Sequence, residues 1–294
     1  MLETLKIFVD LIQTESFSRA ATRNYLTQSA VSQRIRQLET ELGQQLVVRG
    51  RGRMRPTEAG RVFYDASKEI LDRYAQARDE LNRIRHIVSG TLRLATVHSV
   101  GLHVLPPYIK SLLVEFPAVD MQLEYRRSNE IYEGLLDLSF DLGIVAYPSR
   151  HSQITQVPFR EDKLVFICPP DHELAKGTSI TLKRLQDQPF IAFEPSIPTG
   201  RVVERALRKA GVDVKIVHRF DNVETLKRAV EIGSGIAIVP NSTIVTELRA
   251  KTLEAIPLGG TGWNRPLTII HKKGRKPSAP ATKFIEILQK GEGE

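Results

Sequence analysis

The sequence is poor in the residues that build several common kinds of site. Its 294 residues include one cysteine, Cys168, which excludes an intrachain disulfide and a cysteine-rich metal centre. Its seven histidines form no pair at the i, i+4 spacing of a helical metal site, so we expect neither a metal nor another cofactor. No apolar run approaches the ~18 residues of a membrane-spanning helix, and the first residues do not resemble a signal or transit peptide. We therefore expect a soluble, cytoplasmic protein without a membrane partner.

The chain also lacks the side-chain patterns of common catalytic sites. No Ser-His-Asp or paired-carboxylate arrangement is recognisable in the sequence. Cys168 ends the apolar run 165–168, which predicts a buried strand residue rather than a redox sensor. The Gly-Ser-Gly tripeptide 233–235 follows a predicted helix and precedes a predicted strand, the reverse of a dinucleotide-binding loop, so we interpret it as a turn. Glu161 and Asp162 are interpreted as turn or cap residues. We predict no enzymatic activity.

The sequence does contain an ordinary globular composition with an unevenly placed basic charge. Hydrophobic residues make up 41% and charged residues 26% of the chain, and its length corresponds to about two domains at ~150 residues each. The net charge is +8. Arg49, Arg51, Arg53 and Arg55 fall within one short segment that contains no acidic residue. Such a local cluster of cations favours a nucleic-acid partner.

The first 60 residues predict short helices followed by a small hairpin. Apolar periodicity and capping residues define the helices. The predicted helices are 2–14, then 18–25 after a cap at Ser16 or Ser18, then 28–42 between a cap at Thr27 and a left-handed Gly43. The segments 45–48 and 53–56 flank a Gly-Arg-Gly turn and predict the two strands of the hairpin.

The second and third of these helices predict a helix-turn-helix. Small residues stand where the helices would cross (Ala20, Ala21 and Ala30), and Val31, Ile35 and Leu38 form an apolar inner face on the third helix. Polar side chains occupy its outer face, where they can bond base edges and phosphates of double-stranded promoter DNA. The predicted DNA-binding residues are Thr27, Gln28, Ser29, Ser32, Gln33 and Arg36, with Arg51 and Arg53 of the hairpin against the backbone or minor groove.

A long helix is predicted over residues 57–88. Phe63, Ser67, Ile70, Tyr74, Ala77, Leu81, Ile84 and Val88 alternate at spacings of four and three residues. This heptad seam is typical of a coiled coil between two copies of the chain. The alternative is a helix that lies on its own globular core. We assign dimerisation to Phe63, Ile70, Tyr74, Ala77, Leu81 and Ile84.

After residue 90 the pattern changes to alternating strands and helices. Such alternation predicts mainly parallel sheets with helices on both faces, in two α/β lobes. The predicted strands are 91–96, 121–126, 141–145, 164–168, 190–193, 215–220, 236–239 and 267–271. The predicted helices include 105–115, 131–136, 200–210 and 223–232, and 272–280 is interpreted as a basic loop.

The segment from Phe17 to Gly43, which begins Phe-Ser-Arg-Ala-Ala, resembles the N-terminal domain of the LysR-type transcriptional regulators. Pro56-Thr57-Glu58-Ala59-Gly60, after the hairpin, matches the same family. The resemblance is specific over 17–60 and looser beyond 90. The chain departs from the family pattern at 47–50 and 54–56, which concerns the path of the hairpin rather than the fold.

The resemblance implies a winged helix-turn-helix over 1–60, a linker helix over 61–89 and an effector domain over 90–294. That domain would resemble periplasmic binding proteins, with one lobe over about 91–161 and 268–290 and the other over about 162–267. The family also implies an antiparallel coiled-coil homodimer, a homotetramer made of two dimers, and RNA polymerase as a further candidate partner. The implied effector-binding residues are His98, Ser99, Val100, Ser128, Asn129, Ala146, Pro195, Ser196, Thr199 and Val239.

The predicted positions of these residues agree with a physical argument. They follow the carboxyl ends of predicted strands, where open parallel sheets bind ligands. Ser99 and Ser128 precede helices, whose free N–H groups attract anions, so we expect a small carboxylate or inorganic anion as effector. For either serine the alternative is an ordinary helix cap. Arg126 and Arg127 could reach the same anion, or they could be a solvated strand end.

A rival hypothesis makes the α/β part an enzyme or a solute-binding module with vestigial DNA binding. The lack of a catalytic pattern argues against an enzyme. A binding module would have no need of the seam over 63–88. The sequence therefore favours a regulator that binds specific DNA and responds to a small molecule.

Overall fold

A computed structural model describes residues 1–49, 54–84 and 88–291 of the chain. The chain forms two compact units, Met1–Ile87 and Val88–Glu294. Arg51 and Arg53, which the sequence assigns to DNA binding, lie outside the described residues.

The first unit is built on helices α1 (Leu2–Thr14), α2 (Phe17–Arg23) and α3 (Gln28–Leu42). The Ser16 hydroxyl accepts a hydrogen bond from the Arg19 backbone N–H, and the Thr27 hydroxyl accepts one from Ala30. Gly43 ends α3 with φ +62°, in the left-handed conformation that glycine adopts without strain. The predicted caps of α3 are confirmed, and of the two candidate caps for α2 the structure selects Ser16.

A two-stranded hairpin follows α3. Strands β1 (Val47–Arg49) and β2 (Met54–Pro56) pair antiparallel. One oxygen of the Glu39 carboxylate accepts hydrogen bonds from the Leu46 and Val47 backbone N–H groups at 2.8 and 3.1 Å. Glu39 thereby fixes the start of the hairpin to α3. The predicted hairpin is confirmed.

Helix α4 (Glu58–Ile84) begins at the Thr57 hydroxyl, which accepts a hydrogen bond from the Gly60 N–H. A Cβ on Gly60 would lie 2.0 Å from the Leu46 carbonyl oxygen, so only glycine lets the helix pass this close to the hairpin.

The predicted seam of α4 divides into two parts. Phe63 packs on Phe8 of α1, with ring centroids 5.4 Å apart, and Ser67 is buried. Ile70, Tyr74 and Leu81 are 48%, 54% and 63% exposed, and Ala77 is exposed as well. The alternative of a helix lying on its own core therefore describes the first turns of α4. Ile70, Tyr74, Ala77 and Leu81 form the exposed part of the seam among the residues whose burial the structure describes.

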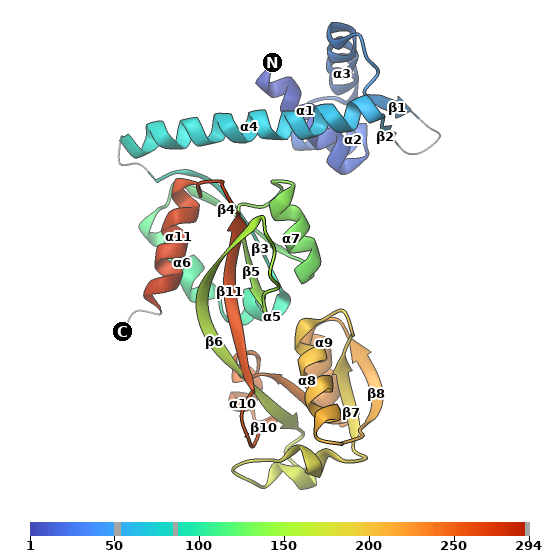
Figure 1. The fold of residues 1–294 in the computed structure, drawn as a ribbon, viewed down its shortest axis with the longest axis vertical. Helices are drawn as coiled ribbons and strands as arrows, with labels where there is room; N and C mark the ends of the chain where they lie inside the picture. The colour runs from blue at the N-terminus through green and yellow to red at the C-terminus, as the bar shows by residue number, and fades with distance from the viewer. Residues whose placement is uncertain (50–53, 85–87, 292–294) are drawn as a thin grey trace. The chain divides into compact units, whose positions relative to one another are not determined.

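The second unit consists of two α/β lobes joined by two long strands (Figure 1). Its strands are β3 (Gly90–Thr96), β4 (Val119–Tyr125), β5 (Leu142–Ala146), β6 (Ile154–Cys168), β7 (Pro189–Phe193), β8 (Lys215–Phe220), β9 (Ala237–Pro240), β10 (Glu254–Pro257) and β11 (Asn264–Lys272). Its α-helices are α5 (His98–His103), α6 (Pro106–Glu115), α7 (Ser128–Leu136), α8 (Pro198–Lys209), α9 (Val223–Glu231), α10 (Val245–Ala250) and α11 (Ala279–Lys290).

Each lobe has its own core, and a seven-stranded sheet with the order β10-β6-β11-β5-β3-β4, with β9 also paired to β6, contains strands of both lobes. In the first lobe β3 pairs parallel with β4 and β5, and residues such as Leu92, Ile144 and Phe284 form the core under α6 and α11. In the second lobe β7 pairs parallel with β8, while β9 and β10 pair antiparallel with the end of β6. Phe166 and Phe190 lie in the core of this lobe. The predicted two-lobed α/β architecture is confirmed.

The prediction of mainly parallel sheets is wrong for the connection between the lobes and for β9 and β10 of the second lobe, which pair antiparallel with β6. Strands β6 and β11 pair with each other antiparallel from Ile154↔Lys272 to Lys163↔Asn264, and β11 also pairs antiparallel with β5. The first part of β6 was not predicted, because its alternating exposed residues include several charges. Glu161 and Asp162 belong to this strand, which corrects their interpretation as turn or cap residues. The prediction also missed β10 and α11.

Candidate functional site

The first candidate surface is the polar face of α3. Thr27, Gln28, Ser29, Gln33 and Arg36 are exposed, and Ser32 is half-buried. The opposite face is buried through Val31 and Ile35. This arrangement brings all six predicted side chains on or beside α3 to the unburied side of the helix.

Two contacts organise the start of this face. The Ser18 hydroxyl of α2 donates a hydrogen bond to the Gln28 side-chain oxygen at 3.1 Å. The hydroxyls of Thr27 and Ser29 lie 2.9 Å apart. The two helices of the predicted helix-turn-helix are therefore joined by a polar contact as well as by their common core. Arg55, on β2 of the hairpin that follows α3, is exposed.

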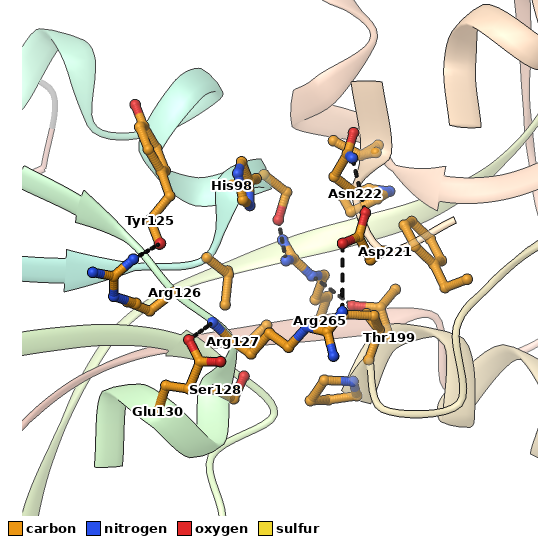
Figure 2. Close-up of a pocket in the computed structure, with 18 residues that line it drawn as sticks. His98, Tyr125, Arg126, Arg127, Ser128, Glu130, Thr199, Asp221, Asn222 and Arg265 are labelled. Carbon is orange, nitrogen blue, oxygen red and sulfur yellow. Dashed lines mark hydrogen bonds and ion pairs between the residues drawn. The ribbon is translucent and has the colours of Figure 1, made fainter. Parts of the chain in front are cut away.

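The second candidate site is a cleft of about 170 Å³ between the two lobes of the second unit (Figure 2). This volume is below the roughly 300–1,000 Å³ typical of sites for drug-sized ligands, so the cleft suits a small molecule. Its walls come from residues that follow strands β3, β4, β5, β7, β8 and β9. Predicted effector residues that line the cleft are His98, Ser99, Ser128, Ala146 and Thr199.

Other predicted effector residues lie beside the cleft without lining it. Val100 and Val239 are fully buried in the cores of their lobes. Asn129 is exposed. Pro195 and Ser196 are exposed, and their backbone carbonyls accept hydrogen bonds from the Arg201 guanidinium. In each case a neighbour along the chain lines the cleft instead: Ser99, Ser128, Ile197 and Pro240.

Arg265 of β11 is the most deeply buried charge of the cleft, with 2% of its surface exposed. Its guanidinium donates to the hydroxyl of Ser99 in the first lobe at 2.6 Å and to the hydroxyl of Thr199 in the second at 3.3 Å. It also pairs with the Asp162 carboxylate at 3.3 Å. Burial lowers the pKa of Arg265, and the charge of Asp162 opposes that shift. One buried cation therefore joins residues from both lobes.

Two further groups surround this cation. The Asp162 carboxylate accepts a hydrogen bond from the Ser242 hydroxyl at 2.6 Å, which holds it in the second lobe. Burial raises the pKa of Tyr147 to about 12, although the positive charge of Arg265 acts in the opposite direction. Arg265 was not among the effector-binding residues predicted from the sequence. The available signal was a lone arginine directly before the apolar residues of a strand.

The wall of the first lobe carries an aromatic pair and an unsatisfied hydroxyl. The His98 and Tyr125 rings stack with centroids 5.0 Å apart and an interplanar angle of 17°. The Ser128 hydroxyl is buried and makes no hydrogen bond within the described part of the chain. Buried hydroxyls usually have a partner, so this one has an open bonding position on the cleft wall.

At the cleft wall Arg127 spans the two lobes. Its guanidinium lies 3.4 Å from the Asp221 carboxylate and 3.5 Å from that of Glu194, both in the second lobe. The hydrogen bond from the Asn222 side chain is the main cause that lowers the pKa of Asp221; desolvation opposes it, and the hydrogen bond and charge of Arg127 add to the lowering. Arg126 pairs with Glu124 within the first lobe. Arg127 is thus an inter-lobe contact, and not only the solvated strand end that the sequence left open.

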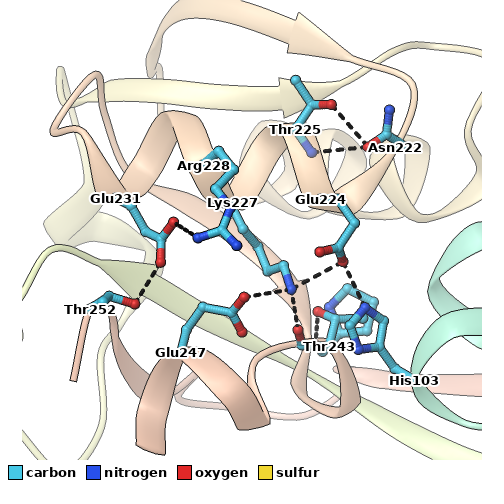
Figure 3. Close-up of polar contacts among 11 residues, drawn as sticks. His103, Asn222, Glu224, Thr225, Lys227, Arg228, Glu231, Thr243, Glu247 and Thr252 are labelled. Carbon is cyan, nitrogen blue, oxygen red and sulfur yellow. Dashed lines mark hydrogen bonds and ion pairs between the residues drawn. The ribbon is translucent and has the colours of Figure 1, made fainter. Parts of the chain in front are cut away.

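A second polar contact between the lobes lies outside the cleft lining (Figure 3). His103 of α5 lies 2.7 Å from the Glu224 carboxylate of α9. The ammonium of Lys227, 2% exposed, contacts Glu224 at 3.0 Å, Glu247 at 2.9 Å and the Thr243 carbonyl at 2.6 Å. Desolvation raises the pKa of Glu224, but hydrogen bonds from His103 and Lys227 outweigh it, and the net shift is downward.

Two absences concern the described residues. Within residues 1–49, 54–84 and 88–291, no group of three or more His, Cys, Asp or Glu side chains is placed to hold a metal ion. No helix in that same part of the chain is both long and apolar enough to cross a membrane.

Comparisons with known proteins agree with this architecture. Residues 2–61 match the family "bacterial regulatory helix-turn-helix protein, lysR family", and residues 86–292 match the "LysR substrate binding domain". The RuBisCO operon transcriptional regulator of Acidithiobacillus ferrooxidans is 30% identical over 98% of this chain and 93% of that protein.

Two solved structures share the fold. Full-length CbnR complexed with its target DNA has a TM-score of 0.68 and 22% identity, over 99% of each chain. The regulatory domain of CcmR from Synechocystis PCC6803, in complex with 2-PG, has a TM-score of 0.65 and 24% identity, over 70% of this chain and 99% of that one.

These matches confirm the predicted family and exclude the rival hypothesis of an enzyme, because the relatives are named as transcriptional regulators. The chain belongs to the LysR family of DNA-binding transcriptional regulators, with a helix-turn-helix domain and an effector-binding domain.

Proposed function

We propose that this regulator binds a small anion in the inter-lobe cleft and converts that binding into a change at its operator DNA. The observation that carries the anionic part is Arg265, a buried guanidinium on the cleft wall that contacts both lobes. Asp162 offsets part of this charge, but a cation in a poorly solvated site interacts with a nearby anion more strongly than one in water, because the surroundings screen it less.

Two further features support an anion. Helices α7, α8 and α9 begin at the cleft, with Ser128, Thr199 and Val223 on its wall. Helix N-termini present free N–H groups and a partial positive charge. The buried hydroxyl of Ser128 has no partner within the described chain and could donate to an anion oxygen. The solved CcmR domain, whose ligand is 2-PG, adds an effector to test.

Calorimetric titration of the full-length protein tests this proposal. The titrants are inorganic sulfate, inorganic phosphate, 2-PG and an uncharged sugar, all at constant ionic strength. We expect at least one anion to bind, and Ser128→Ala to weaken that binding about three- to tenfold through loss of one hydrogen bond. The matched control is Asn129→Ala, because Asn129 is the exposed neighbour that does not line the cleft. Binding of the sugar alone would contradict an anionic effector.

For the DNA-binding unit we propose that α3 enters the major groove. Gln28, Ser32, Gln33 and Arg36 are the candidates for base contacts, with Thr27 and Ser29 positioned for phosphates. Arg51 and Arg53 are proposed to contact the flanking backbone. The support is that the side chains on and beside α3 share one unburied side next to a basic hairpin.

We also propose that residues 70–84 of α4 pair with a second copy of the chain. The exposed Ile70, Tyr74, Ala77 and Leu81 support this pairing, and Ile84 continues their spacing. On this proposal residues 1–60 bind DNA, 61–89 form the linker and dimerisation helix, and 90–294 bind the effector. Homodimers would pair further into homotetramers and act on RNA polymerase at the promoter. A cytoplasmic location follows from the need to reach that DNA.

A further inference from the structure

We propose that Arg127 is an internally inhibited effector ligand. Its guanidinium is held across the cleft by Asp221 and Glu194, and an entering anion must compete with these carboxylates for it. This inference rests on the proposed anionic effector and adds a means of setting its affinity and of linking its binding to the separation of the lobes.

The geometry of Arg127 allows exchange. Arg127 is the residue immediately before α7, Asp221 precedes α9 and Glu194 follows β7. The three side chains are between 41% and 51% exposed, and the guanidinium nitrogen lies 3.4–3.5 Å from each carboxylate. Strong charge-assisted hydrogen bonds measure about 2.7–2.9 Å, and exposed ion pairs contribute little. These contacts are therefore weak enough for a well-placed anion to replace them.

The contrast with Arg265 shows which cation can move. Arg265 is buried and donates to Ser99, Thr199 and Asp162, so its position is fixed whether or not an anion binds. Arg127 has a carboxylate pair on one side and lines the same cleft as Ser128 on its own lobe. Movement of its side chain toward an anion would break both contacts to the second lobe. Anion binding and this inter-lobe contact therefore exclude each other.

The negative charge of Asp221 is constant over the physiological pH range. The pKa of Asp221 is lowered by Asn222 and by Arg127, so its carboxylate stays ionised well below neutral pH. The competing carboxylates therefore weaken the affinity for the anion by the same factor over this pH range. Internal inhibition also predicts that removal of Asp221 or Glu194 strengthens anion binding chiefly by releasing Arg127, and only to a smaller extent by reducing repulsion of the anion.

The test is titration of the full-length protein with inorganic phosphate at constant ionic strength. Asp221→Asn and Glu194→Gln are expected to bind phosphate about two- to fivefold more tightly than the wild type, the range that release of an exposed ion pair provides. Arg127→Gln is expected to bind about tenfold more weakly. Asp221→Asn added to Arg127→Gln should then change the phosphate affinity little, because the Arg127 guanidinium that Asp221 holds is already absent.

General repulsion of phosphate by Asp221 is distinguished by that double variant. Repulsion would tighten binding equally with and without Arg127, and this result would overturn the proposal. A second control is His103→Gln, which removes the inter-lobe contact to Glu224 outside the cleft lining. Unchanged phosphate affinity is expected. Equal tightening by His103→Gln would mean that loosened lobes, rather than a released arginine, explain the effect.

Failure of this inference can be told apart from failure of the anionic effector. Phosphate binding by the wild type with no response to Asp221→Asn or Glu194→Gln would overturn only the role of Arg127. Absence of phosphate binding from the wild type together with clear binding by Asp221→Asn would support internal inhibition when the double variant with Arg127→Gln does not bind, and would overturn it when that double variant binds as tightly. Absence of binding from every variant would overturn both.

Discussion

The polar face of α3 and the inter-lobe cleft hold their charged and polar side chains in opposite ways. On α3 most of these side chains are exposed, and their contacts are few and local, such as Ser18 with Gln28. In the cleft, Arg265 and Arg127 contact acidic or hydroxyl groups from distant segments of the chain. Exposed side chains can adapt to a large polyanion, whereas side chains already engaged can discriminate among small molecules because a ligand must fit or replace existing contacts.

Among substitutions that test this difference, the largest expected effect is on the free energy of unfolding and comes from Arg265 in the cleft. Arg265→Met removes the cation and leaves the Asp162 carboxylate, 7% exposed, without its charge partner. Breaking a buried pair in this way costs about 3–5 kcal/mol. We expect that loss in the free energy of unfolding, measured by urea denaturation. Arg265→Met with Asp162→Asn should recover part of it, and a change below about 1 kcal/mol in the single variant would contradict the assigned role.

On the first unit the largest effect is expected in the seam of α4. Leu81→Glu places a charge where a second copy is proposed to pack and forgoes burial of an apolar side chain, about 1.5–3 kcal/mol per chain. Sedimentation velocity should show dissociation toward monomers. Leu113→Glu is the control, since Leu113 is another exposed leucine, 40% against 63% for Leu81, and lies on α6 outside the seam. Monodisperse dimers of Leu81→Glu at low micromolar concentration would argue against pairing through α4.

A smaller effect is expected on α3, where each side chain acts nearly alone. Gln33→Ala should cost about 1–3 kcal/mol on a specific operator and little on random duplex, because a base contact carries sequence information. Arg51→Ala should instead weaken binding to both DNAs and reduce the salt dependence. Fluorescence anisotropy at two salt concentrations measures both. Identical behaviour of the two variants on the two DNAs would contradict the groove assignment.

The smallest expected effect is on stability at acidic pH and comes from Glu224. The folded-state pKa of Glu224 is lower than its ordinary value near 4.5 because His103 and Lys227 stabilise its charge against desolvation. Its contribution is therefore fully present above about pH 4.5 and is lost as the pH falls through the folded-state pKa. Thermal unfolding of Glu224→Gln should show a slightly shallower loss of stability below pH 4.5 than the wild type. Parallel curves would mean that the contact contributes nothing measurable.

The two regions also differ in how far the sequence revealed them. The sequence predicted the limits of α1 and α3 and the caps Thr27 and Gly43, because contacts within a few residues determine them. It also predicted the polar face of α3. The unsatisfied N–H groups of a helix start need an acceptor nearby, and Thr27 supplies it. The polar face follows because the buried Val31 and Ile35 fix which side of the helix remains outside.

The cleft could be predicted only in outline. His98, Ser99, Ser128, Ala146 and Thr199, which line the cleft, were predicted from the resemblance to the family, and the rule that ligands bind at the carboxyl ends of parallel strands agreed with them. Arg265 and Asp162 were missed because they lie on long antiparallel strands whose pairing crosses from one lobe to the other. No sequence pattern near Arg265 indicates that its hydroxyl partners are Ser99 and Thr199.

By itself, the sequence determined the family, the helix-turn-helix with its hairpin, the long helix with its apolar seam, and the presence of two α/β lobes. The family rests on the resemblance of the residues between Phe17 and Gly60, and the other features depend on periodicity and on contacts between near neighbours. Only the tertiary structure decided that part of the seam is buried within the unit and part exposed. Only the tertiary structure decided, too, that Arg265 and Arg127 join the lobes. The physical reason is that a buried or bridging charge is stable only beside partners that folding brings from distant positions.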